Sequence, residues 1–342
     1  MPSERAIRIC PWASRASTFL ASLLLLSLAS LAACGGNGPT SAPTGDPTAP
    51  VSAEGRWVAG SSMPTPRTEI AAAALDGLIY VAGGFTAEGA ISGAFEVYDP
   101  DEDSWAELSR LPTPRHHAAL AALDGRLYLT GGYSTGDFSS PSTKAWVYDP
   151  ASPGWVEIEE MPGGRAAHAM AAVSGTLFVV GGVGTDPAQT WSYDPLSDIW
   201  ELRASIPTRR EHLAAVGHDG RIFAIGGRGF GRGNTAAVEA YDPFTDGWER
   251  LPDMPTARGG LTAAVVDKGI HVTGGEDFGP NRVFAEHELF HVPTRTWVRL
   301  ADLPTARHGL GSAGFDSRFV VVGGAEIAAS AFGHGVVEVY TE

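Results

Sequence analysis

The chain has 342 residues, and its 24 lysines and arginines against 39 aspartates and glutamates give a formal net charge of −15. An acidic chain without runs of Lys or Arg is not expected to bind nucleic acid, and it resists lying flat on an anionic lipid surface. Its two cysteines, Cys10 and Cys34, are too few for a disulfide-stapled scaffold or a thiolate metal cluster.

Residues 1–33 have the pattern of a secretory signal peptide. Three arginines precede an apolar run from Phe19 to Ala33, which is shorter than the ~20 residues that span a bilayer. The run ends in Leu31-Ala32-Ala33-Cys34, which resembles a bacterial lipobox. That resemblance implies that Cys34 is acylated and becomes the mature N-terminus. An ordinary signal peptide and an uncleaved anchor are the alternatives.

Residues 34–54 are the predicted linker. They are mainly Gly, Pro, Ser, Thr and Ala, a composition that cannot bury enough apolar surface to order itself. We therefore expect an exported protein, held to the bacterial cell envelope by lipid alone, at the periplasmic face of the outer membrane or at the cell surface. A single domain, residues 55–342, would project from this tether.

That domain is built from six repeats with nearly fixed internal spacing. The tryptophan always stands 7 residues after the aromatic residue, the arginine 10 residues after the tryptophan, and the Gly-Gly doublet 16 residues after the arginine. Only the step from the doublet to the next aromatic residue varies, between 12 and 17 residues. The doublets begin at Gly83, Gly131, Gly181, Gly226, Gly274 and Gly323, the aromatic residues are Tyr98, Tyr148, Tyr193, Tyr241, Phe290 and Tyr340, and the tryptophans are Trp57, Trp105, Trp155, Trp200, Trp248 and Trp297.

Each repeat contains four short strands. In the second repeat these are predicted at 116–123, 126–130, 145–148 and 155–158, separated by turn signals such as Asp124-Gly125 and Asp149-Pro150. The repeats recur every 45 to 50 residues, and a period of this length is typical of stacked or radial repeats. Four strands in each of six units predict an all-β protein, a six-bladed β-propeller with four-stranded antiparallel blades.

The order of the markers also predicts how the ring closes. Trp57 precedes the first Gly-Gly doublet, and no tryptophan follows Tyr340. The N-terminal strand, near residues 56–59, should therefore be the fourth strand of the last blade. This arrangement leaves no unpaired strand edge at either end of the array, whereas an open solenoid leaves both end strands unpaired.

These same residues resemble the kelch repeat, in which a Gly-Gly doublet is followed by Tyr, by Trp and by a Pro-x-x-Arg segment. The resemblance covers residues 56–342. It implies a kelch propeller in which the loop after Gly-Gly lies on the same face as the start of the innermost strand. Because that loop alone varies in length, we expect the binding site on this face.

The repeated arginines are the first candidates for that site: Arg67, Arg115, Arg165, Arg210, Arg258 and Arg307. Six guanidinium groups in a ring could bind a carboxylate or phosphate. The alternative is structural, with each arginine bonded to loop carbonyls and an acid of its own blade.

Residues that differ between the repeats are better candidates. Near the arginines and at the starts of the variable loops we select Glu69, His117, Tyr133, His168, Glu211, His212, Arg228, Glu276 and His308. Rings, imidazoles, acids and a cation on one concave face suit a glycan or a protein partner. We expect a monomeric binding module, with a structural scaffold as an alternative.

Catalysis and metal binding have weaker support. No G-x-S-x-G or H-E-x-x-H motif occurs, and four of the histidines that could bind a metal lie on separate repeats. We therefore expect neither a metal nor a cofactor. The resemblance also implies two enzyme types. Copper galactose oxidases are excluded because their Tyr–Cys cross-link has no cysteine here, and a sialate-type sugar-acid mutarotase or isomerase, using Glu and Arg groups of the same face, remains the alternative.

Overall fold

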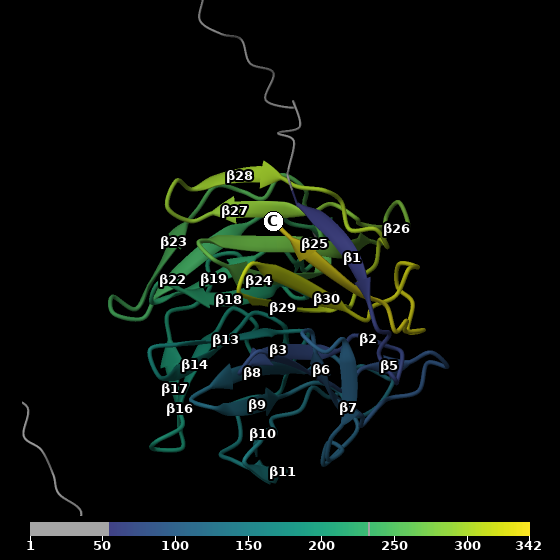
Figure 1. Cartoon of the computed structure of the whole chain (residues 1–342). Helices are drawn as coiled ribbons and strands as arrows, with labels where there is room; N and C mark the ends of the chain where they lie inside the picture. The colour runs from purple at the N-terminus through teal and green to yellow at the C-terminus, as the bar shows by residue number, and fades with distance from the viewer. Residues whose placement is uncertain (1–54, 232) are drawn as a thin grey trace, which may run out of the picture. The chain divides into compact units, whose positions relative to one another are not determined.

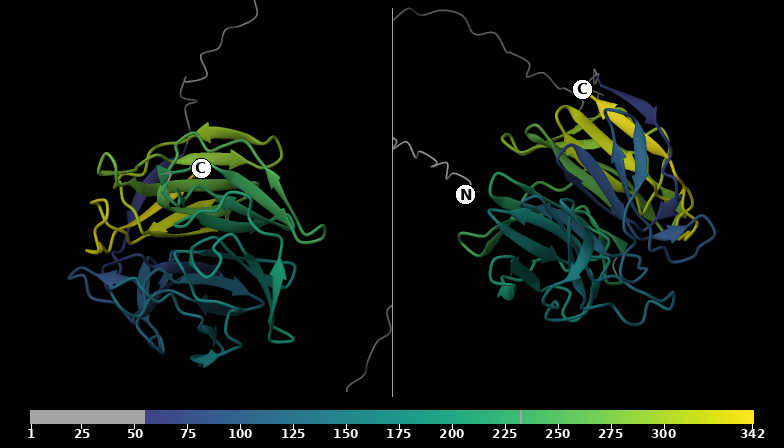
Figure 2. Two further views of the ribbon diagram at one scale, coloured as in Figure 1. Left: turned by 180° about the vertical axis from the view of Figure 1, so that it is seen from behind. Right: turned by 60° about the horizontal axis from the view of Figure 1, so that its bottom comes forward.

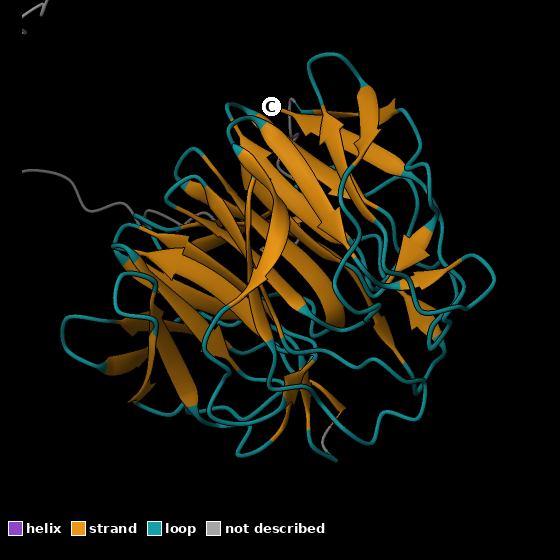
Figure 3. Ribbon diagram, turned by 90° about the horizontal axis from the view of Figure 1, so that it is seen from below, coloured by secondary structure: helices purple, strands orange, loops and turns teal. Residues whose placement is uncertain are grey.

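The computed structural model describes residues 55–231 and 233–342 (Figure 1). The predicted signal peptide, lipidated Cys34 and linker fall in residues 1–54, outside the described residues. In the described ranges the secondary structure consists of strands joined by loops and turns (Figure 3). No helix suited by length and apolarity to crossing a membrane is found there.

Six four-stranded antiparallel sheets form the blades. Blade 1 has β3 (Ala71–Leu75), β4 (Leu78–Ala82), β6 (Phe95–Asp99) and β7 (Ser104–Glu107), and blade 2 has β8 (Ala119–Leu123), β9 (Arg126–Thr130), β10 (Ala145–Asp149) and β11 (Ser152–Glu157). Blade 3 has β13 (Ala169–Val173), β14 (Thr176–Val180), β16 (Thr190–Asp194) and β17 (Ile199–Arg203), and blade 4 has β18 (Ala214–His218), β19 (Arg221–Ile225), β22 (Val238–Asp242) and β23 (Gly247–Arg250). Blade 5 has β24 (Gly259–Val266), β25 (Gly269–Asp277), β27 (Glu288–His291) and β28 (Thr296–Arg299). The predicted six-bladed propeller is confirmed.

Blade 6 joins the two ends of the domain. Its order is β29 (Gly311–Phe315), β30 (Arg318–Val322), β31 (Val337–Thr341) and then β1 (Arg56–Gly60). β1 is antiparallel to β31, with Trp57 opposite Tyr340, and the two strands lie side by side in Figures 1 and 2. The prediction that the N-terminal strand completes the last blade is therefore confirmed.

The innermost strands surround the propeller axis. β3, β8, β13, β18, β24 and β29 each contact the next, and β29 contacts β3. These strands crowd one another: a Cβ on Gly217 would lie 2.1 Å from the carbonyl oxygen of Ala172 on the neighbouring strand. This crowding explains the alanine runs at these positions, because larger side chains would overfill the space around the axis.

The repeated aromatic residues join neighbouring blades. Six hydrophobic clusters each lie between two adjacent blades. Each repeated tryptophan donates its indole N–H to a backbone carbonyl of the preceding blade or its connection: Trp105 to Ser61, Trp155 to Ser109, Trp200 to Glu159, Trp248 to Ala204, Trp297 to Pro252 and Trp57 to Ala301, over 2.8–3.2 Å. Trp57 makes the same bond as the other tryptophans, but it lies near the N-terminal end of the domain and its partner Ala301 near the C-terminal end, so this bond spans the point where the ring closes.

Candidate functional site

The loop after each Gly-Gly doublet returns to the segment that follows the repeated arginine. In every blade the residue after the arginine pairs with the first residue after the doublet: Thr68 with Phe85, His116 with Tyr133, Ala166 with Val183, Glu211 with Arg228, Gly259 with Glu276, and His308 with Ala325. Some of these pairs form small sheets, β2 (Arg67–Thr68) with β5 (Phe85–Thr86) and β12 (Arg165–Ala166) with β15 (Val183–Gly184). Two further short strands belong to the variable loops, β21 (Gly233–Asn234) paired with β20 (Arg228–Gly229) and β26 (Arg282–Val283) paired with β25. The variable loops and the starts of the innermost strands share one face, which we call the loop face.

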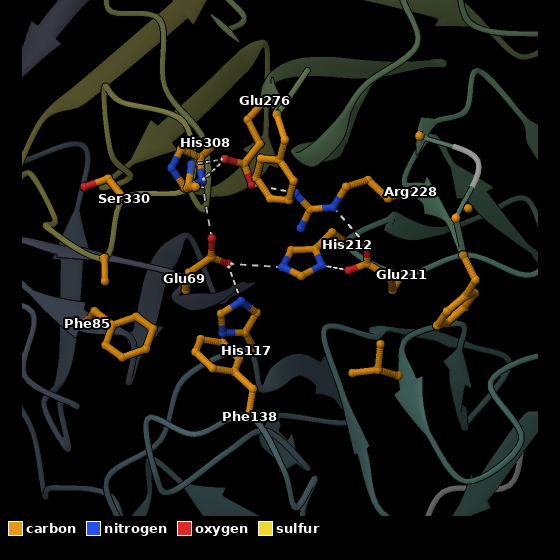
Figure 4. Close-up of a pocket in the computed structure, with 18 residues that line it drawn as sticks. Glu69, Phe85, His117, Phe138, Glu211, His212, Arg228, Glu276, His308 and Ser330 are labelled. Carbon is orange, nitrogen blue, oxygen red and sulfur yellow. Dashed lines mark hydrogen bonds and ion pairs between the residues drawn. The ribbon is translucent and has the colours of Figure 1, made fainter. Parts of the chain in front are cut away.

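A ring of backbone hydrogen bonds surrounds the axis on the loop face. Its members stand two residues after each arginine and have left-handed φ values of 49° to 69°: Glu69, His117, Ala167, His212, Gly260 and Gly309. From Glu69 to Gly309, each carbonyl accepts the amide N–H of the next member over 2.9–3.2 Å, and Ile70 N–H to Gly309 O, at 3.4 Å, closes the ring. This backbone conformation is unfavourable for residues with a Cβ. Three of the four non-glycine members carry polar side chains that meet at the centre of the site (Figure 4).

A pocket of about 620 Å³ opens on this face. Its base is polar and contains seven of the predicted residues: Glu69, His117, Glu211, His212, Arg228, Glu276 and His308. Its upper wall is aromatic, with Phe85, Phe138, Phe230 and Phe278 from the variable loops of blades 1, 2, 4 and 5. Three of these rings are unusually exposed for phenylalanine, Phe138 by 50%, Phe230 by 42% and Phe278 by 54%.

The polar groups at the base form one network centred on Glu69 (Figure 4). Its Oε2 lies 3.3 Å from His117 Nε2 and 4.0 Å from His212 Nε2, and its Oε1 lies 3.3 Å from His308 Nδ1. A second set of contacts surrounds Arg228, whose guanidinium donates to Glu211 Oε1 at 2.9 Å and to Glu276 Oε1 at 2.7 Å. The network therefore links residues from blades 1, 2, 4, 5 and 6.

Burial and mutual contact set the protonation of these groups. Burial would raise the pKa of Glu69, but the imidazoles around it hold that pKa well below its usual range. Burial, reinforced by the charge of Arg228, lowers the pKa of His212 well below the ordinary value. Burial opposes protonation of His308, yet the adjacent carboxylates of Glu69 and Glu276 raise its pKa. Burial and contacts within the network therefore shift the pKa values of Glu69 and His212 downward and that of His308 upward.

The comparisons with known proteins agree with this architecture. A model of the KLHDC2/KLHL20/DRC7 Kelch-repeats domain matches residues 54–205 and 159–324. The chain belongs to the kelch-repeat family. Among solved structures, one titled "Structure of YjhT" superposes on the chain with a TM-score of 0.70 at 19% identity, covering 81% of this chain and 95% of that one. No curated protein matches the chain. Kelch propellers are generally binding or scaffold modules.

The six kelch arginines do not line the pocket. All six are buried, each 2% exposed or less. Four pair with a glutamate: Arg67 with Glu96, Arg210 with Glu239, Arg258 with Glu288 and Arg307 with Glu338. The other two stack on a tryptophan, Arg115 on Trp146 at 4.0 Å and Arg165 on Trp191 at 4.1 Å. These contacts agree with the structural alternative, in which each arginine is held by groups of its own blade, except that a tryptophan replaces the acid beside Arg115 and Arg165.

The arginine contacts also explain one of the fixed spacings. Arg67, Arg115, Arg165 and Arg307 each donate to the carbonyl of the first glycine of their own doublet, 16 residues ahead. Because the bond joins the arginine to one defined glycine of the kelch repeat, it leaves no room for insertions between these two residues. The partner of each arginine stands two residues before the repeated aromatic residue, as Glu in four repeats and Trp in two. Reading that position would have predicted the buried pairs.

Two further predicted residues lie outside the pocket lining. Tyr133 is buried and stacks on His116, with ring centroids 5.4 Å apart. His168 is buried and shares a hydrogen bond of 2.9 Å with Thr130 Oγ1. Their position on separate repeats does not keep the histidines apart, because His117, His212 and His308 all reach Glu69. The start of each innermost strand points to the axis, so distant repeats meet there.

Proposed function

We propose that this kelch propeller is a binding module for a neutral glycan, which enters the pocket on the loop face. The observation that carries the proposal is the combination of exposed rings above and buried polar groups below. Aromatic rings stack on the apolar faces of sugars, and carboxylates and imidazoles accept or donate hydrogen bonds to hydroxyl groups. A pocket of about 620 Å³ is in the size range of small-molecule sites.

The charges at the base favour a neutral sugar over an acidic one. Among the described residues that line the pocket, the carboxylates are Glu69, Glu211 and Glu276, and the one guanidinium is that of Arg228. That guanidinium already bonds two of the carboxylates. Without a bound cation, a sugar acid would therefore meet more negative than positive charge. This argues against the sugar-acid mutarotase as the alternative function, although the buried Glu and His groups would suit proton transfer on a neutral sugar.

A panel of glucose, galactose, N-acetylglucosamine, lactose and N-acetylneuraminate tests this proposal. We expect at least one neutral sugar to raise the melting temperature, with affinity then measured by calorimetry, and N-acetylneuraminate to have no effect. The variants Phe138→Ala and Phe278→Ala should each weaken binding of that sugar about 10-fold, or about 1.4 kcal/mol.

Phe244→Ala is the matched control, because Phe244 is 96% exposed in the turn between β22 and β23, outside the pocket lining. Its variant should bind like the unchanged protein. Equal weakening by all three substitutions, or selective binding of N-acetylneuraminate, would count against the proposal.

We also propose that Cys34 carries the lipid that holds the protein at the cell envelope, on the strength of the sequence Leu31-Ala32-Ala33-Cys34. The expected result is that the expressed protein partitions into the detergent phase and that Cys34→Ser abolishes this. Mass spectrometry of the mature N-terminus decides the matter. A start at any other residue, or an unmodified Cys34, contradicts the anchor and leaves the pocket unaffected.

A further inference from the structure

The base of the pocket holds three imidazoles whose inner nitrogens all point at one carboxylate. The outer nitrogen of each is already held by another group. Histidines that bind metals have this arrangement, because the outer N–H is donated to a carboxylate, a carbonyl or another acceptor, which orients the inner nitrogen. We propose that the protein binds one divalent transition-metal ion through His117 Nε2, His212 Nε2 and Glu69 Oε2.

The hydrogen bonds of His117 leave its inner nitrogen without a proton. His116 Nε2 lies 3.1 Å from the carbonyl oxygen of Thr135, which can only accept, so this nitrogen of His116 is the donor. In a neutral ring, His116 Nδ1 is then an acceptor, and it receives the Nδ1–H of His117 over 2.6 Å. His117 Nε2 is left with a lone pair, 3.3 Å from Glu69 Oε2. Two lone pairs face each other unless a cation lies between them.

His212 repeats this arrangement from the far side of the axis. Its Nδ1 is in contact with the carboxylate of Glu211, so the proton of a neutral ring resides there. Its Nε2 therefore also presents a lone pair toward Glu69 Oε2, 4.0 Å away. The donor atoms of Glu69, His117 and His212 all lie within 4.8 Å of one another. An ion between them would satisfy all three at once.

The donor atoms of the neighbouring group, Glu69, Glu276 and His308, also lie within 4.8 Å of one another, but this group needs no metal. Glu276 Oε1 accepts from Arg228 and Glu276 Oε2 accepts the backbone N–H of Ala329, each at 2.7 Å. A single proton on His308 Nδ1 would serve both facing carboxylates, at 3.3 and 3.4 Å. This second group instead fixes the orientation of Glu69, and we assign one ion rather than two.

The scaffold around the three proposed metal ligands is rigid and open on one side. Glu69, His117 and His212 belong to the backbone ring that surrounds the axis, so their positions are fixed by the propeller scaffold and not by the variable loops. Their side chains are 11%, 7% and 15% exposed and line the pocket, which leaves coordination positions free on that side. Two imidazoles and one carboxylate suit Zn²⁺, Mn²⁺, Fe²⁺ or Co²⁺ rather than Ca²⁺ or Mg²⁺, which prefer oxygen ligands.

Titration of chelator-treated protein with Zn²⁺ and Mn²⁺ in a calorimeter, and with Co²⁺ followed by visible absorption, tests the proposal. We expect one tightly bound equivalent and Co²⁺ bands typical of nitrogen and oxygen ligands. His117→Gln and His212→Gln should each weaken binding at least about 100-fold. Glu211→Gln, which changes the group that orients His212, should weaken it about 10- to 100-fold.

His168→Gln is the control, because it removes a buried histidine whose ring faces Thr130 rather than a carboxylate. This variant should bind the metal as the unchanged protein does, and melting curves in the presence of chelator verify that every variant is folded. Failure of the unchanged protein to bind any of the three ions overturns the proposal, as does tight binding that survives in His117→Gln and His212→Gln. The titrations contain no sugar and the sugar panel can be run with chelator, so either proposal can fail without the other.

Discussion

Deleting residues 56–60 should destabilise the propeller severely. The deletion removes β1, which pairs with β31 along its whole length, and it exposes the edge of β31 to water and to other chains. It also removes Trp57, whose ring packs on His287, Phe319 and Tyr340. Since a domain is stable by only about 5–15 kcal/mol, we expect aggregation or a melting temperature lower by more than about 10 °C, measured by calorimetry and light scattering.

Single substitutions in β1 separate ring closure from general damage. Trp57→Ala should cost about 3 kcal/mol, since it removes a large packed ring and the bond to Ala301. Val58→Ala, at a side chain that is 50% exposed in the same strand, should cost less than about 0.5 kcal/mol. A truncated protein that remains monomeric and melts at the original temperature would mean that β1 does not close the ring.

Glu239→Gln should produce the largest loss of stability among single charge-removing substitutions in blade 4. Glu239 is 1% exposed and pairs with Arg210, which has no exposed surface. Removing the negative charge leaves a buried guanidinium without its counterion, which typically costs about 3–5 kcal/mol. Chemical denaturation of the two proteins measures the difference.

The matched control is an ion pair on the surface. Arg299 and Asp302 pair through side chains that are 51% and 48% exposed, and Asp302→Asn should cost less than about 1 kcal/mol. If Glu239→Gln proved as harmless as Asp302→Asn, the buried arginines would not be the structural elements that their contacts indicate. Sugar binding by folded Glu239→Gln should be unchanged, because neither partner of the pair lines the pocket.

The sequence predicts the scaffold well because each repeated residue has a local and repeated role. Tryptophan bonds to the preceding blade, the arginine of four repeats bonds to the first glycine of its doublet, and the doublet itself needs left-handed backbone. Gly83, for example, has φ of 66°, and a Cβ there would lie 2.4 Å from the carbonyl oxygen of Arg115 in the next blade. Roles of this kind are visible as fixed spacings, even in a single sequence.

The site is less predictable because it is made where the repeats differ. Glu69, His117 and His212 occupy one equivalent position in three blades, but their meeting at one point depends on the left-handed backbone ring. The phenylalanines at the mouth lie in loops of different lengths, so no spacing rule places them. The prediction of the loop face followed from variation in loop length, whereas the convergence of the histidines required the structure.

The most direct test of the central claim, that ligands bind in the pocket on the loop face, is ¹⁹F NMR of protein labelled with fluorophenylalanine. The spectrum is recorded during titration with glucose, galactose, N-acetylglucosamine and lactose in turn, with signals assigned by single Phe→Leu substitutions. We predict that one of these sugars shifts the signals of Phe138, Phe230 and Phe278 and leaves that of Phe244 unchanged. A shift at Phe244 with the three pocket signals constant, or no shift with any sugar, would contradict the claim.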